Sequence, residues 1–364
     1  MVGKSKSHYA ASKSYPPNGG PPARSRVRLF RSLLATLAVL LIVGLIVSRL
    51  DKSRNAGFEP AERKSLFPQL AERMDDVQSV EIIVPAERYH LKKSRKGWRL
   101  IERDGYPIPG DNVTEFLESF AGMSALYVSK GGERSSTDYG VARTGESKVG
   151  VGTMVTVLDK AGSHLAQATL GYAVSVPGDA RKLLAARRED SSRIWMVDGN
   201  IKIPGMPVDW LERDLVDIPR DAVAKFTIVP PNDRSVVIER TGDNDLVVKK
   251  GLSTKEELRG PWVLDRLVAA FENLTFVDVR TAVGIDAFDR EPWQSELVTK
   301  NGLAYKVDLF RIESADWAIF SASARDKKLA HDAKTFNTRH TAWAYRLPFP
   351  VTSRLRTEAD QLVK

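Results

Sequence analysis

Cysteine is absent from this chain of 364 residues. The protein therefore forms no disulfide, carries no thiol nucleophile and offers no thiolate to a metal ion. The absence does not exclude an oxidising compartment, because a chain of this length buries an adequate core without disulfides. In this respect the sequence is compatible with a bacterial periplasm.

Acidic residues are absent from the first 31 positions, which contain seven Lys and Arg. The same segment includes SYPPNGGPPARS, a stretch rich in Pro, Gly and Ser. A segment of this composition cannot form a packed core. We therefore predict that residues 1–31 are a disordered basic tail.

Polar residues are almost absent from the segment that follows, since Thr36 is the only one between Leu33 and Val47. With Arg31 at the inner interface, the stretch from Leu29 to Val47 is long enough to cross a hydrocarbon core about 30 Å thick. We predict a single transmembrane helix over residues 32–49. The alternative is a cleaved signal peptide, but the SRLDKSRNAG that follows contains no small-x-small cleavage pair.

The distribution of charge predicts the orientation and excludes one class of partner. The basic tail favours a cytoplasmic N-terminus, with the main part of the chain in the periplasm and the helix in inner-membrane lipid. The formal net charge is +9, but the 48 basic and 46 acidic residues after the tail leave only +2. We therefore expect no nucleic-acid partner.

Small residues recur every four positions along the predicted transmembrane helix, at Ser32, Thr36, Gly44 and Ser48, with Leu40 completing the row. Such a ridge allows close approach of a second helix, either from a membrane-protein partner or from another copy of the chain. The alternative is that these residues have no recognition role, because small residues are common in membrane-spanning helices.

The remainder of the chain contains a duplicated pattern. Each half has three short strand patterns separated by turn residues. They are SVEIIV, YHLKK and GWRLIE in the first half, and AKFTIV, SVVIER and DLVVKK in the second. We predict two α+β units of one design, residues 65–216 and 217–364, each an antiparallel sheet with helices on one face. Residues 50–64 are predicted to be a linker.

A helix pattern follows each strand triplet. Its apolar residues fall at i, i+3, i+4 and i+7, which places four side chains on one stripe. The stripes are Val113, Phe116, Leu117 and Phe120 in the first half, and Leu264, Leu267, Val268 and Phe271 in the second. We predict that Phe120 and Phe271 are buried, each against its own sheet.

Four stretches of the first unit form a further set: SLFPQLAERMDDVQSVEIIV from Ser65, the GW at Trp98, the GYPIP before the first helix, and TDYGV. Together they resemble the family named Domain of Unknown Function 4340, over a range from about Ser65 to the C-terminus. The resemblance implies a membrane-anchored extracytoplasmic protein with an accessory role beside ABC transporters of the gliding-motility type. It implies no catalytic residues.

Motifs that carry chemistry are missing or incomplete. The sequence contains neither G-x-S-x-G nor H-E-x-x-H, and GESKVGVGT (Gly145–Thr153) lacks the Lys-Ser/Thr pair of a phosphate-binding loop. His331 and His340 are too far apart for a helical metal pair. Asp286, Asp289 and Glu291 lack the spacing of a calcium loop. We therefore expect no metal, no cofactor and no enzymatic activity.

Tryptophan offers one candidate site. Four of the seven alternate with polar residues in strand patterns, as core-facing aromatics do. These are Trp98, Trp195, Trp317 and Trp343. Trp293 lies instead in the EPWQ stretch and is the candidate exposed aromatic.

Three classes of function remain open. We favour a noncatalytic accessory or interaction subunit of an envelope complex associated with an ABC transporter. The alternatives are a periplasmic module that binds polysaccharide or lipid, and an envelope hydrolase with an unrecognised site. A cleft lined by exposed aromatics favours the binding module, whereas convergent polar groups in a deep pocket favour the hydrolase. Exposed sheet edges favour the interaction subunit.

Overall fold

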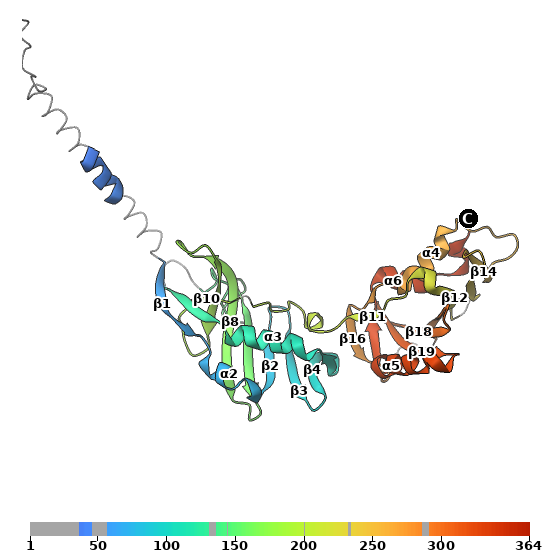
Figure 1. Ribbon diagram of the computed structural model, residues 1–364, viewed down its shortest axis with the longest axis horizontal. Coiled ribbons are helices and arrows are strands. Elements are labelled where there is room, and N and C mark those ends of the chain that lie inside the picture. Colours follow the sequence, from blue (N-terminus) through green and yellow to red (C-terminus); the bar gives the residue numbers. More distant parts are fainter. Residues whose placement is uncertain are drawn as a thin grey trace, which may run out of the picture.

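The computed structural model describes residues 36–45, 57–130, 136–143, 145–199, 201–231, 234–285 and 291–364. Residues 36–45 form a helix whose residues are all exposed (dark blue in Figure 1). Within these described ranges, no helix is both long enough and apolar enough to cross a membrane. The predicted span 32–49 reaches beyond the described helix at both ends, so it stays a prediction.

The first unit is built on a ten-stranded sheet in which every neighbouring pair is antiparallel, in the order β1-β6-β10-β9-β8-β7-β2-β3-β4-β5 (Figure 1). Its strands are β1 (Phe58–Ser65), β2 (Val77–Ile83), β3 (Arg88–Ser94), β4 (Gly97–Leu100), β5 (Tyr106–Ile108), β6 (Ser124–Ser129), β7 (Thr153–Asp159), β8 (His164–Ser175), β9 (Lys182–Arg188) and β10 (Trp195–Asp198). Its helices are α2 (Pro68–Glu72) and α3 (Gly110–Ala121), with short 3₁₀ turns η1 (Met74–Asp76), η2 (Ile101–Arg103) and η3 (Pro207–Trp210).

The second unit is built on an eight-stranded antiparallel sheet in the order β14-β13-β12-β17-β18-β19-β20-β16. Its strands are β12 (Val223–Val229), β13 (Val236–Arg240), β14 (Leu246–Lys250), β16 (Asp278–Thr281), β17 (Trp293–Thr299), β18 (Leu303–Ile312), β19 (Ala315–Ala324) and β20 (Trp343–Arg346), and a separate pair joins β11 (Asp214–Val216) to β15 (Leu274–Thr275). Its helices are α4 (Trp262–Val268), α5 (Ala330–His340) and α6 (Phe349–Leu355), with 3₁₀ turns η4 (Arg220–Ala222), η5 (Ala269–Phe271), η7 (Lys327–Leu329) and η8 (Ala359–Leu362).

The two sheets repeat one strand order. With the outermost strands β1 and β5 set aside, the first sheet reads β6-β10-β9-β8-β7-β2-β3-β4 and the second, read from its other end, β16-β20-β19-β18-β17-β12-β13-β14. Each strand of one sheet thus has a partner in the other at the same place in the chain order. The fold is α+β, and the repeated order agrees with the duplicated sequence pattern.

The predicted helical stripes are buried. Phe120 is fully buried in α3 and stacks on Phe67 at a ring-centroid distance of 4.6 Å. Phe271 is fully buried in η5, which continues α4, and meets Phe226 of β12 edge-on at 5.7 Å. The prediction for these two residues is confirmed. Both residues belong to a core cluster that continues from one unit into the other.

The predicted linker over residues 50–64 is wrong at its C-terminal end, because Phe58–Ser65 forms β1. This strand pairs with β6 along the edge of the first sheet. Phe58 is buried and meets Tyr139 edge-on at 6.3 Å. The local composition of this stretch is charged and predicts irregular structure. It becomes a strand because its backbone pairs with β6 and the side chain of Phe58 is buried.

The two units meet through aromatic and charged side chains. Tyr106 of β5 is buried, and its ring lies edge-on to Trp343 at 4.8 Å and to Phe276 at 5.8 Å. Nε of Arg103 donates to Asp278 Oδ1 at 2.6 Å. The backbone N–H of Thr281, in the outermost strand β16, donates to Asp104 Oδ2 at 2.8 Å. Asp104 of the first unit thus accepts a hydrogen bond from the edge strand of the second sheet. Unpaired backbone groups on an edge strand promote pairing with another chain, and this contact satisfies one of them.

Candidate functional site

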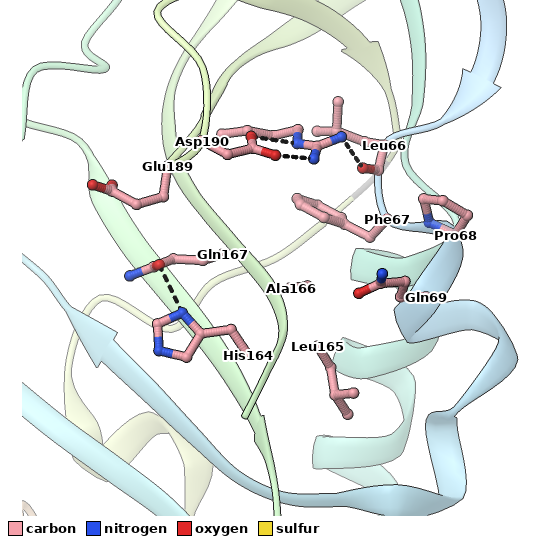
Figure 2. Close-up of a pocket in the computed structure, with 11 residues that line it drawn as sticks. Leu66, Phe67, Pro68, Gln69, His164, Leu165, Ala166, Gln167, Glu189 and Asp190 are labelled. Atoms are coloured by element: carbon pink, nitrogen blue, oxygen red, sulfur yellow. Dashed lines mark hydrogen bonds and ion pairs between the residues drawn. The ribbon is translucent and has the colours of Figure 1, made fainter. Parts of the chain in front are cut away.

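A surface pocket of about 420 Å³ lies in the first unit between α2, the start of β8 and the end of β9 (Figure 2). Pro68 begins α2 directly after Phe67, whose buried ring is fixed on Phe120. This contact holds α2 against α3, and α2 also packs beside β8. The lining residues are Leu66, Phe67, Pro68, Gln69, His164, Leu165, Ala166, Gln167, Arg188, Glu189 and Asp190.

The charged groups of this pocket are paired with one another or with near neighbours. Arg188 contacts Asp190 through two nitrogens, and its Nε lies 2.9 Å from Asp190 Oδ1. The same guanidinium donates to the carbonyl oxygen of Leu66 at 3.4 Å. Glu189 Oε2 lies 2.8 Å from Nε of Arg143. Each ionic group at this end of the pocket is thus neutralised before any ligand arrives.

Two further polar residues of the pocket, His164 and Gln167, contact each other. His164 Nδ1 lies 3.0 Å from Gln167 Oε1, and Figure 2 shows His164 at the opposite end of the group from Asp190. The described lining residues include no Ser, Thr, Lys or Tyr. Covalent catalysis through a hydroxyl or amine nucleophile has no candidate among them. The arrangement therefore offers a recess with mixed polar and apolar walls in which the charged groups are already paired.

Two described histidines outside this pocket have different surroundings: His340 lies in the core and His90 is half-buried. His340 is buried, and its Nδ1 lies 2.9 Å from the hydroxyl oxygen of Tyr345. Burial, assisted by Arg339, lowers the pKa of His340 to about 4. His90 lies between two carboxylates, with Nδ1 2.6 Å from Glu102 Oε1. No group of His, Asp and Glu able to hold a metal ion occurs among the residues that the structure describes.

The residues predicted from sequence fall in several places. Thr36 and Gly44 lie in the described helix, whereas Ser32 and Ser48 lie outside the described residues. Trp293 begins β17 and is half-buried, with the Arg356 guanidinium 5.8 Å from its ring centroid, so it is not the exposed aromatic that we expected. In the acidic cluster, Asp286 and Asp289 lie outside the described residues.

The glycine-rich stretch that superficially resembles a phosphate loop has a packing role. A Cβ at Gly152 would overlap the carbonyl oxygen of Gly140, and one at Gly171 would overlap that of Tyr139. The TDYGV turn therefore lies directly on β8, and the N–H of Tyr172 donates to Tyr139 O at 2.9 Å. Close approach of two backbones requires glycine at these positions.

Sequence reasoning missed Trp262, a residue that is 57% exposed. It begins α4 and lies beside a second pocket, of about 350 Å³, between α4, α6 and η8. A signal was available in the sequence. Trp262 precedes the apolar stripe that begins at Leu264 and does not share its spacing, so it points away from the core.

These observations define a class: a two-unit α+β protein with duplicated antiparallel sheets. The model of the family described as "Domain of unknown function (DUF4340)" matches residues 98–292, a little more than half of the chain. The chain belongs to this family. No curated protein and no solved structure matches the chain.

Proposed function

We propose that this protein is a membrane-anchored, extracytoplasmic accessory subunit of an envelope complex associated with an ABC transporter, and that it acts by binding. The observation that carries the proposal is the order of the chain. A basic tail and an apolar run precede two sheets that are fastened together through Tyr106 and Arg103. This order suits a rigid body held at a membrane surface.

The shape supports an interaction role. Figure 1 shows the two units side by side, with β1 at one end and α4 and the C-terminus at the other. Since β1 is the first described strand after the apolar run, the first unit lies nearer the membrane and the second projects away from it. An elongated body of two sheets offers partners a long surface, and its firm junction lowers the ordering cost of binding.

The association with a transporter rests on family membership. The family resemblance implies an accessory role beside transporters, and it implies no catalytic residue. Within the described residues of the first pocket, the charged groups Arg188, Glu189 and Asp190 are paired and His164 contacts Gln167, which agrees with a role that does not require catalysis.

Co-purification tests this proposal. The full-length chain is tagged, extracted with a mild detergent and purified from its native membrane, and the bound proteins are identified by mass spectrometry. We expect transporter permease and ATPase subunits at near-stoichiometric yield. A control in which residues 33–47 are replaced by polyleucine keeps insertion and tests whether the helix ridge contributes. Recovery of the chain without any transporter subunit contradicts the proposal.

A further inference from the structure

The second pocket has a different charge balance from the first. Three arginines line it: Arg259 just before α4, Arg266 within α4 and Arg354 from α6. The described lining residues include no carboxylate, and their other polar members are Ser353, Thr357 and Gln361. A recess with several guanidinium groups and no lining acid attracts an anion.

Two of these arginines are held in place by the protein backbone. Nε of Arg259 donates to Val363 O at 2.7 Å, and an Nη of Arg354 donates to Ala269 O at 3.0 Å. Nε of Arg354 is buried and makes no hydrogen bond to the described part of the chain. A buried donor without a partner is costly, and a bound anion that reached it would remove this cost.

Trp262 forms one wall of the same recess and is fixed although it is exposed. Its indole lies against Gly260, where a Cβ would stand 2.7 Å from Nε1 and 2.8 Å from Cδ1. Glycine at this position therefore lets the ring rest on the chain. Trp262 and Arg266 are four residues apart, so they share one face of α4. A flat apolar ring and a cation thus stand side by side over the pocket.

We propose that this pocket binds an acidic saccharide. A sugar carboxylate would accept hydrogen bonds from the guanidinium groups, and the C–H face of its pyranose ring would pack on Trp262. Ser353, Thr357 and Gln361 offer partners for ring hydroxyls. The site lies between α4 and α6 of the second unit, which is the unit farther from the membrane in the proposed arrangement (Figure 1). The proposal does not require a transporter partner.

Calorimetric titration of the full-length protein in mild detergent tests the site. The probe is tetragalacturonate, and maltotetraose is the neutral probe of similar size. We expect measurable binding of tetragalacturonate only. Arg266→Glu and Trp262→Ala should each weaken it at least about tenfold, since they remove a charge contact and the stacking surface respectively.

Matched controls separate the pocket from general charge. Arg95→Glu makes the same charge change at an exposed turn of the first unit, and Tyr172→Ala removes an exposed aromatic that also rests on a glycine, Gly140. Both variants should bind within about twofold of the wild type. Equal weakening by Arg95→Glu and Arg266→Glu, equal binding of maltotetraose, or no binding of tetragalacturonate would each overturn the proposal. Displacement by equimolar inorganic phosphate would overturn the saccharide assignment.

Discussion

The two units share a strand order but differ in what surrounds the sheet. In the first unit the final strand β10 is followed by the short turn η3 and then by the chain that enters the second unit. In the second unit β20 is followed by α6 and η8, which form walls of the arginine-rich pocket. The repeated topology therefore sets the scaffold, and the segment after the last strand determines which unit has a charged recess.

The charges follow the same division. Arg188, in the pocket of the first unit, is bound by Asp190, whereas Arg259 and Arg354 in the second pocket are held by carbonyl oxygens and no lining residue of that pocket is acidic. Carboxylate partners close a recess to anions, while carbonyl partners orient a guanidinium without neutralising it. The same fold can thus carry a closed recess and an open one.

The largest expected effect tests whether the two cores are equivalent. Phe120→Ala and Phe271→Ala each remove a fully buried ring, which costs about 3–5 kcal/mol of unfolding free energy. Denaturant unfolding of the full chain measures both losses. If either substitution costs less than about 1 kcal/mol, the two helices do not have equivalent roles.

The next effect tests whether the units are coupled. Tyr106 is buried at their junction, and Tyr106→Ala should cost about 3 kcal/mol. The contacts of Arg103 and Asp104 with the second unit remain, so the junction is weakened rather than lost, and we expect the unfolding of the two units to become less cooperative and to broaden or split. Calorimetry detects this change, and Tyr172→Ala, which removes an exposed ring, serves as the control. A single transition at unchanged midpoint would show that the contact does not couple the units.

A smaller effect concerns the pH dependence of stability, which His340 of the second unit should influence. The pKa of His340 is lowered to about 4 in the folded protein, against an ordinary value near 6.5. The unfolded chain therefore binds a proton more readily, so this contribution is full above pH 6.5 and is lost as pH falls toward 4. It amounts to about 3 kcal/mol. His340→Gln should flatten the stability of the protein between pH 6.5 and 4, and an unchanged slope would contradict the assignment.

The last prediction concerns the N-terminal helix and should leave the stability of the two units unchanged. Gly44→Ile places a bulky side chain on the predicted ridge with Thr36, whereas Val43→Ile changes a neighbouring position off it. Neither should alter membrane insertion. Crosslinking to a transporter subunit, or between two copies, should fall only in Gly44→Ile. Equal crosslinking yields for the two variants would show that the ridge has no role in recognising a partner.

Local periodicity predicted much of the fold, and tertiary contacts explain the rest. The strand triplets and the stripes that end in Phe120 and Phe271 are visible because each repeats at a fixed spacing. Strand β9 reads KLLAARR, whose Leu, Ala and Arg favour helix locally, and the sheet overrides that preference. Helix α5 has only Ala333 and His340 buried, so its stripe is too weak to recognise.

The pockets were harder to predict than the strands. Arg266 and Arg354 lie far apart in the sequence and meet only because α4 packs beside α6. Nothing in the local composition of either segment indicates that they share a recess. The EPWQ stretch predicts that Trp293 lies in a loop, yet Trp293 begins a strand and packs against Arg356. Exposure of an aromatic depends on tertiary packing that periodicity does not encode.

The most direct test of the account is the topology of the anchored chain. Alkaline phosphatase is fused after Lys364 and the fusion is produced in a bacterium, with enzyme activity and membrane retention measured together. We expect active phosphatase, because the tail of seven basic residues holds the N-terminus inside, and a protein that stays in the membrane fraction at high salt. An inactive fusion, or a soluble form that begins near Asp51, would contradict the membrane-anchored arrangement.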